Sequence, residues 1–169
     1  MLFGDRSVVL GVNQKEHVLN AVLLAVGVGA VLQPSYDRAM TVQIGVVFVP
    51  ILLGTLLPDV DAHFGRHRKA LHNLFVVGVV VAYPVYVANL EWVWVGVITH
   101  YVLDVLGTQR GIALFYPLWS REFGVPVGVH TASPWADVVT IAVTALEVGV
   151  LVGAATLART PIVPQSIAI

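Results

Sequence analysis

The sequence contains no cysteine. This absence excludes disulfide bonds and every metal site built on thiolates, because both need the cysteine sulfur. It also leaves the redox compartment unreadable from the sequence. A metal site in this chain would therefore have to use imidazole, carboxylate or carbonyl ligands.

Charged residues are also few. They make up 11% of the chain, against about 25% in ordinary soluble domains, while 57% of the residues are hydrophobic and the mean hydropathy is +0.85. A chain so poor in charge cannot cover a surface that faces water. The net charge of −1 also argues against nucleic acid as a partner. The composition therefore predicts one integral-membrane domain over residues 1–169, located in the cell (inner) membrane, with membrane lipids and no nucleic acid as partners.

Long apolar runs dominate what the chain does contain. A spanning helix needs about 20 mostly apolar residues, and only helices or closed barrels satisfy the backbone in lipid. The runs are continuous rather than alternating, which favours helices over a barrel. The fold class predicted is all-α, a multi-pass transmembrane helical bundle of about five spans. The spans are predicted over residues 17–33, 40–57, 71–89, 91–107 and 135–157.

The basic residues predict the orientation of this bundle. With five spans, the N-terminus shares one side with the 58–70 and 108–134 loops. That side carries seven of the nine Lys and Arg residues, and the other side carries only Arg38 and Arg159. Basic residues are enriched in cytoplasmic loops, so the N-terminus is predicted to be cytoplasmic. Arg66 and Lys69 have two open interpretations, as topology signals alone or as parts of a site.

Most other ionisable residues gather at the same predicted face. The stretch "LLPDVDAHFGRHRKALHN" at residues 56–73 holds two aspartates and three histidines between two apolar runs. Pro58 before the aspartates predicts that Leu57 leaves the helix in an extended conformation. His100 and Asp104, four residues apart, share one helix face near the end of the fourth span. An early histidine, His17, is predicted to open the first span at that face.

Histidine and carboxylate side chains together suit Zn, Mn or Fe(II), and ionisable residues within spans are rare and usually functional. The sequence thus predicts a divalent metal site at the cytoplasmic face. Simpler interpretations stay open, namely helix capping for His63 and His130 and a buried hydrogen bond between His100 and Asp104. The predicted metal ligands are His17, Asp59, His67, His72, His100 and Asp104.

Two further features, Glu147 and the 108–134 loop, lie outside the predicted metal site. Glu147 lies near the middle of the fifth span, where we expect a protonated carboxyl hydrogen-bonded to a neighbouring helix. The 108–134 loop is rich in aromatic residues, which favour the membrane interface. It is either a simple interfacial belt or a re-entrant flap that admits a lipid headgroup to the metal.

Three segments together resemble a known family. "LLPDVD", "HRKALHN" and "HYVLDVLGTQRGIALFYPL", preceded by the early histidine, resemble the YdjM-like, LexA-regulated inner-membrane metal-dependent hydrolases. The resemblance implies a site at Asp59, Asp61, His67, His72, His100 and Asp104. His17, Gly111 and Pro117 match the family pattern more loosely. Lys69, Leu71 and Asn73 depart from it, since the family usually has Gly, Thr and Ser at these positions.

The function predicted is a membrane-embedded metal-dependent hydrolase that acts on a lipid or another amphipathic ester or phosphoester at the interface. Whichever of Asp59, Asp61 and Asp104 does not ligate the ion would be the general base, with Asp61 the predicted one. Arg68 is the predicted ligand of a phosphate oxygen pair, or else only a positive-inside anchor. The alternative function is non-catalytic, a metal-binding structural subunit or a transporter component.

Overall fold

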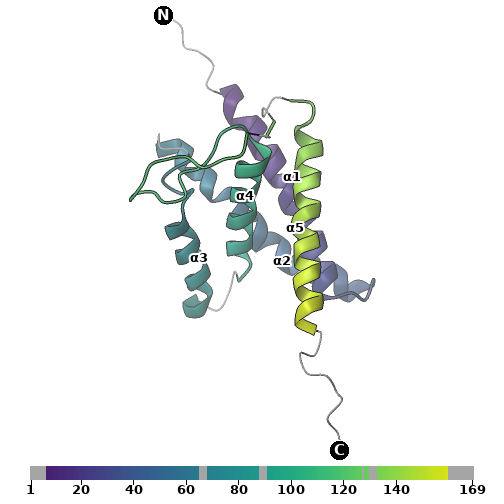
Figure 1. The fold of residues 1–169 in the computed structure, drawn as a ribbon. Coiled ribbons are helices and arrows are strands. Elements are labelled where there is room, and N and C mark those ends of the chain that lie inside the picture. Colours follow the sequence, from purple (N-terminus) through teal and green to yellow (C-terminus); the bar gives the residue numbers. More distant parts are fainter. Residues whose placement is uncertain (1–6, 65–67, 88–90, 127, 130–132, 160–169) are drawn as a thin grey trace, which may run out of the picture.

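A computed structural model describes residues 7–64, 68–87, 91–126, 128–129 and 133–159. These residues form α-helices and one short 3₁₀ helix, with two isolated bridges in place of any strand. The prediction of an all-α fold is therefore confirmed. The helices run alternately up and down, so that α1 begins and α5 ends at opposite ends of the bundle (Figure 1). The elements are α1 (Ser7–Leu32), α2 (Arg38–Leu56), η1 (Pro58–Phe64), α3 (Leu74–Val87), α4 (Val93–Gly107) and α5 (Ala136–Arg159).

Three helical stretches are long and apolar enough to cross a membrane, namely Gln14–Leu32, Arg38–His63 and Ala136–Leu157. The apolar stretches Leu74–Tyr83 and Val93–Gly107 are shorter. Helices of 14 and 15 residues, as in α3 and α4, extend only about 21 to 23 Å, against a hydrocarbon core of about 30 Å. Five helices thus lie at the predicted spans, but two of them are shorter than predicted.

The first helix begins earlier than predicted. His17 was expected to open it, whereas α1 begins at Ser7 and His17 lies well inside it. Polar residues of good helix propensity precede His17 and allow the helix to continue. One of them, Lys15, pairs with Asp137 in the first turn of α5 at 2.8 Å. The polar segment is therefore part of α1 and not a connection outside the helix.

The junction after α2 also differs from the prediction. Leu57 keeps helical dihedral angles (φ −57°, ψ −46°) and its amide donates to the Leu53 carbonyl. Pro58 then opens η1, which carries both aspartates of the Asp-x-Asp motif. Proline fits the first turn of a helix because its missing N–H has no partner there. The bias of a residue before proline towards extended backbone is overridden here, and the chain tightens into η1 instead.

Two glycines let α2 and α4 meet backbone to backbone. A Cβ added at Gly54 would lie 2.0 Å from the Val93 carbonyl oxygen, and one added at Gly96 would lie 2.0 Å from the Ile51 carbonyl oxygen. Small residues at such contacts allow membrane helices to pack closely. Beside this contact lies the main buried cluster, formed by α1, α2 and α4 with Ala21, Leu24, Val28, Val47, Ile51 and Val95 among its members.

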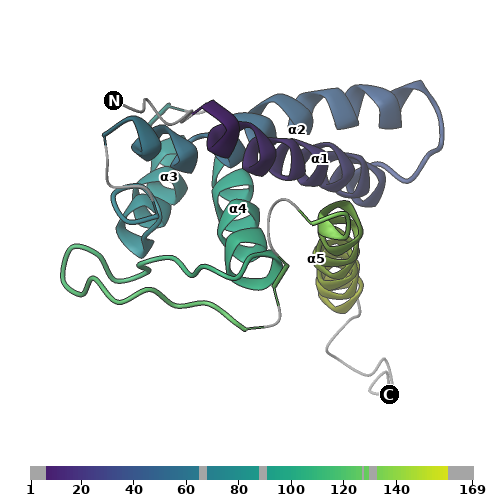
Figure 2. The same ribbon diagram turned by 90° about the horizontal axis from the view of Figure 1, so that it is seen from above.

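The connection between α4 and α5 runs beside α3 and α4, on the side away from α2 (Figure 2). Its two arms are joined where Ile112 and Phe123 exchange backbone hydrogen bonds of 3.0 and 2.8 Å. Ala113 donates to the Arg68 carbonyl, and Leu74 donates to the Leu114 carbonyl. The connection is thereby fixed to the segment that precedes α3, at the end of the bundle where α2 and α4 also end.

Candidate metal centre

Five of the six predicted ligands converge at one end of the bundle. They come from α1, η1, the turn before α3, and α4, which are far apart in the sequence. All five have little or no exposed surface. The sixth, His67, lies outside the described residues. Exposed fractions are 1% for His17, 9% for Asp59, 0% for His72, 0% for His100 and 1% for Asp104.

Two imidazole rings face each other at the centre of this cluster. The Nδ1 of His100 donates to the Thr55 carbonyl oxygen at 2.7 Å, and the Nδ1 of His72 donates to Asp61 Oδ2 at 3.0 Å. In a neutral imidazole only one nitrogen carries a hydrogen, so both Nε2 atoms present lone pairs. These Nε2 atoms lie 3.0 Å apart. A proton or a metal ion between or beside the two Nε2 atoms would satisfy both lone pairs.

Asp104 supplies the negative charge at the same point. Its Oδ2 lies 3.4 Å from His72 Nε2 and 3.5 Å from His100 Nε2, and its Oδ1 lies 3.6 Å from His17 Nε2. Both oxygens are buried, and neither has a hydrogen bond of good geometry within the described residues. Buried carboxylate oxygens are costly unless a donor or a metal satisfies them. The carboxylate of Asp104 therefore points at the place where a cation fits.

The distances between these donor atoms suit a metal ion. With metal–ligand bonds of about 2.1 Å, neighbouring ligands of a tetrahedral site lie about 3.4 Å apart. The donor atoms form two sets, and within each set they lie within 4.8 Å of one another. The sets are His72–His100–Asp104 and His17–Asp59–His100. The donor set of imidazole and carboxylate fits Zn, Mn or Fe(II). The residues present thus fit a divalent ion.

His17 and Asp59 belong to the second donor set, with His100. The ring of His17 stacks on that of His100, with centroids 3.8 Å apart and an interplanar angle of 12°. The Oδ1 of Asp59 lies 3.8 Å from His100 Nε2, while its Oδ2 is buried without a hydrogen-bond partner among the described residues. Asp59 is the most exposed donor of the cluster.

Asp61, the predicted general base, lies behind His72. Its Oδ2 accepts hydrogen bonds from His72 Nδ1 at 3.0 Å and from the Leu71 amide at 3.1 Å. Carboxylates in this position orient metal-bound histidines. The position of Asp61 supports an orienting role.

Arg68, the predicted phosphate ligand, is buried beside Asp104. Its backbone has a positive φ of 66°, which turns the chain before α3. One guanidinium nitrogen, Nη1, donates to Thr108 Oγ1 at 3.1 Å and to the Arg110 carbonyl at 2.8 Å, while Nη2 lies 3.3 Å from Asp104 Oδ1. The guanidinium thus holds the carboxylate of Asp104 and places a positive charge next to the candidate metal position.

Several residues that position the cluster were not predicted. Thr55 supplies the carbonyl that sets the His100 tautomer. The Tyr101 hydroxyl donates to the Leu71 carbonyl at 2.5 Å and accepts from the Asn73 amide at 3.0 Å, so it fixes the turn that carries His72. In the sequence, the only indication of a role for Thr55 is that it is a polar residue inside an apolar helix. The only indication for Tyr101 is that it follows His100 directly.

Asn73, one of the departures from the family pattern, caps α3. Its Oδ1 accepts from the Val76 amide at 3.2 Å, as an N-cap side chain does. Its Nδ2 donates to the carbonyls of Lys69 and Ala70 at 2.9 and 2.8 Å. Serine and asparagine are both preferred at this position. The substitution therefore preserves the cap and adds two bonds to the turn.

The residues given other interpretations also have defined places. His63 is exposed, and its Nδ1 lies 3.3 Å from the Val60 carbonyl, as a residue that caps a helix end would. His130 lies outside the described residues. Phe115, Trp119 and Phe123 contact one another in the connection between α4 and α5, with ring centroids 5.4 to 6.3 Å apart. These aromatic contacts are compatible with both interpretations of that loop.

Comparison with known proteins agrees with this arrangement. A family model described as YdjM inner membrane protein matches residues 12–163, a range that contains the whole cluster. No curated protein and no solved structure matches the chain. The family match and the apolar helices both identify a membrane protein. The chain therefore belongs to the YdjM inner membrane protein family.

Proposed function

We propose that the protein is a metal-dependent hydrolase that acts at the membrane interface on a lipid or another amphipathic ester or phosphoester. The observation that carries the proposal is the pair of facing Nε2 atoms of His72 and His100, 3.0 Å apart. They lie next to the Asp104 carboxylate, whose oxygens have no hydrogen bond of good geometry among the described residues. Bound there, a divalent ion would lower the pKa of a water ligand to about 7 and polarise an ester or phosphoryl oxygen.

The residues of the cluster would have different roles in this reaction. His17, His72, His100 and Asp104 would hold the ion, and Asp61 would keep His72 in the tautomer that ligates. Asp59 fits the general base better than Asp61, because its Oδ2 is buried without a partner among the described residues. That oxygen would be available to take a proton from a water molecule at the centre.

Arg68 would act mainly through Asp104. Its Nη1 is occupied by Thr108 and a backbone carbonyl, and its Nη2 lies against the Asp104 carboxylate. A bidentate grip on a phosphate would require breaking these contacts. We therefore propose that Arg68 fixes the carboxylate and adds positive charge to the centre.

The surroundings of the centre favour an amphipathic substrate. The connection whose backbone bonds to Arg68 and Leu74 carries Leu118 and Trp119, which are 96% and 51% exposed. Aromatic and apolar side chains at the end of a transmembrane bundle favour the interface between headgroups and hydrocarbon. A substrate whose polar ester lies at that depth would reach the centre without leaving the membrane.

The test combines metal content and hydrolysis on the same detergent-purified samples. The parent protein should bind one of Zn, Mn or Fe(II) and hydrolyse at least one member of a panel of phospholipids and phosphoesters. Asp59→Asn should lose turnover, with a smaller loss of metal than His100→Ala shows. Metal binding with background turnover in every variant would instead identify a structural subunit or transporter component. A parent without metal after supplementation would end the proposal.

A further inference from the structure

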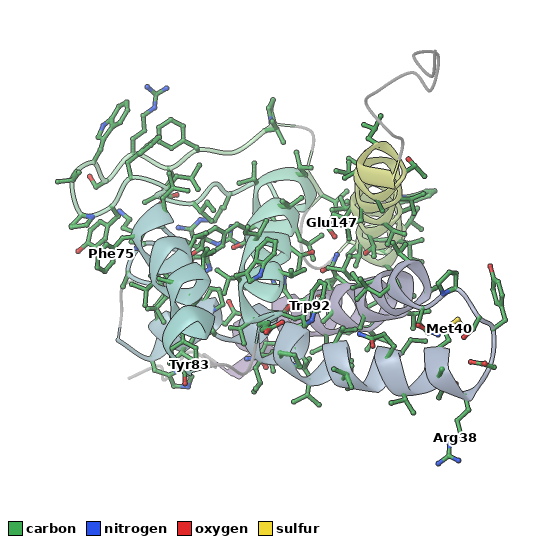
Figure 3. The ribbon with its side chains drawn as sticks, turned by 90° about the horizontal axis from the view of Figure 1, so that it is seen from below. Arg38, Met40, Phe75, Tyr83, Trp92 and Glu147 are labelled. Carbon is green, nitrogen blue, oxygen red and sulfur yellow. The ribbon has the colours of Figure 1, made fainter. Side chains whose placement is uncertain are left out.

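A second buried polar cluster lies between α1, α4 and α5, outside the candidate metal centre. It contains Asn20, Thr99, Thr144 and Glu147, of which the first three are no more than 3% exposed. Glu147 lies on the side of α5 that faces the rest of the bundle (Figure 3). Among the described residues no basic side chain forms an ion pair with it. An ionised carboxylate there would be an uncompensated charge inside a membrane bundle.

The hydrogens available in this cluster can be counted. Asn20 Nδ2 has two hydrogens and lies 2.9 Å from both Thr144 Oγ1 and Glu147 Oε2, so both are used. The Thr144 hydroxyl donates to the Thr140 carbonyl at 2.8 Å. Thr99 Oγ1 lies 2.7 Å from Asn20 Oδ1 and 2.6 Å from Glu147 Oε1.

Thr99 has a single hydroxyl hydrogen and faces two oxygen acceptors at these short distances. If it donates to one of them, the other O···O contact has no hydrogen. A hydrogen on Glu147 Oε1 resolves this shortage. Glu147 then donates to Thr99, Thr99 donates to Asn20, and every polar atom of the cluster has a partner.

Reversing the Asn20 amide does not remove the need for this hydrogen. Amide orientation is assigned from the hydrogen-bond network, so both orientations need to be considered. In the reversed orientation Asn20 Oδ1 would lie 2.9 Å from Glu147 Oε2. Both of these oxygens would be acceptors, so the contact between them would have no hydrogen unless Glu147 is protonated on Oε2. Both orientations therefore require one proton on Glu147.

We infer that Glu147 is a proton-binding site that holds its proton in the folded protein and through it joins α5 to α1 and α4. The neutral carboxyl avoids the cost of a buried charge and supplies the donor that the Thr99 hydroxyl needs. The inference is independent of metal binding, since it uses only the hydrogens and oxygens of this cluster.

Infrared difference spectroscopy of the purified full chain tests the assignment. The parent should show the carbonyl stretch of a protonated carboxyl group, with a small shift in D₂O, and Glu147→Gln should lose that band. Glu122→Gln is the matched control, because Glu122 lies 3.8 Å from Lys69 outside this cluster, and it should leave the band unchanged. Absence of the band in the parent, or its persistence in Glu147→Gln, would overturn the inference.

Thermal unfolding provides a second and independent readout. Glutamine can replace the protonated acid, with its Nε2 donating to Thr99 Oγ1 and its Oε1 accepting from Asn20 Nδ2. Glu147→Gln should therefore unfold at the temperature of the parent, whereas Glu147→Ala should unfold several degrees lower. Equal destabilisation by both substitutions would mean that the native group is a charged carboxylate and would contradict the inference.

Discussion

Asp104→Asn is the most informative single substitution in the candidate metal centre. The Asp104 carboxylate lies 3.4 to 3.6 Å from the Nε2 atoms of three histidines and 3.3 Å from the Arg68 guanidinium. Asparagine keeps the volume and one acceptor oxygen but removes the charge that favours a bound cation. Any change in metal binding therefore reports on that charge and not on a cavity.

Two effects of this substitution can be given magnitudes. Loss of a residue that only orients a ligand lowers metal affinity about 10- to 100-fold, which is about 1.4 to 2.7 kcal/mol, and loss of a ligand should cost at least as much. Without the metal, Arg68 remains as a charged side chain that is 4% exposed and has lost its carboxylate. Breaking a buried pair in this way costs about 3 to 5 kcal/mol of folding stability.

The two effects are separable with a second substitution. Arg68→Met removes the buried positive charge, so Asp104→Asn should destabilise that background much less than it destabilises the parent. Metal per chain is measured by elemental analysis, metal affinity by competition with a chelator, and stability by thermal unfolding in detergent. Asp137→Asn is the control, because it neutralises an exposed aspartate paired with Lys15.

Two results would refute the reasoning. One is an Asp104→Asn variant with the metal affinity and the unfolding temperature of the parent. The other is a parent chain that binds none of Zn, Mn or Fe(II). In the second case a shared proton, and not a metal, lies between the facing imidazoles.

Three other predictions concern packing, the turn before α3 and orientation. Gly96→Ala should strongly lower the unfolding temperature, because its methyl group would press on the α2 backbone, whereas Gly149→Ala, with nothing within 4 Å of its new Cβ, should not lower it. Tyr101→Phe should cost about 1 kcal/mol of stability and weaken metal binding, since the hydroxyl bonds the turn that carries a histidine ligand; unchanged metal affinity would contradict that coupling. In intact cells an impermeant thiol reagent should label Tyr36→Cys but not Ser120→Cys, and the reverse pattern would overturn the cytoplasmic N-terminus.

The sequence determined the class of the protein and the ingredients of its site. A low share of charge and long apolar runs leave only a membrane-spanning helical fold, since water would not solvate such a surface and lipid would not satisfy another backbone. Alternation of five helices then brings the ends of α2 and α4 and the start of α3 to one end of the bundle. Histidines and aspartates at those positions were therefore predictable as a cluster from their place in the chain.

Helix boundaries were predicted less well because they depend on neighbours. The polar residues before His17 were interpreted as a connection, but they have good helix propensity and α1 extends through them. Leu57 follows the helical path into η1 against the usual preference of a residue before proline. Local patterns therefore locate the helices but not their first and last turns.

Only the tertiary structure decided which atom faces which. The two imidazoles that meet at 3.0 Å are 28 residues apart, and the carbonyl that sets the His100 tautomer is 45 residues from it. The same long-range packing places Asp61 against His72 and Arg68 against Asp104. It also places Glu147 within hydrogen-bond distance of side chains on two other helices. Spacing along one chain fixes which residues share a helix face. Whether a lone pair meets a hydrogen, a carboxylate or another lone pair depends on how separate helices pack, and no local pattern encodes that.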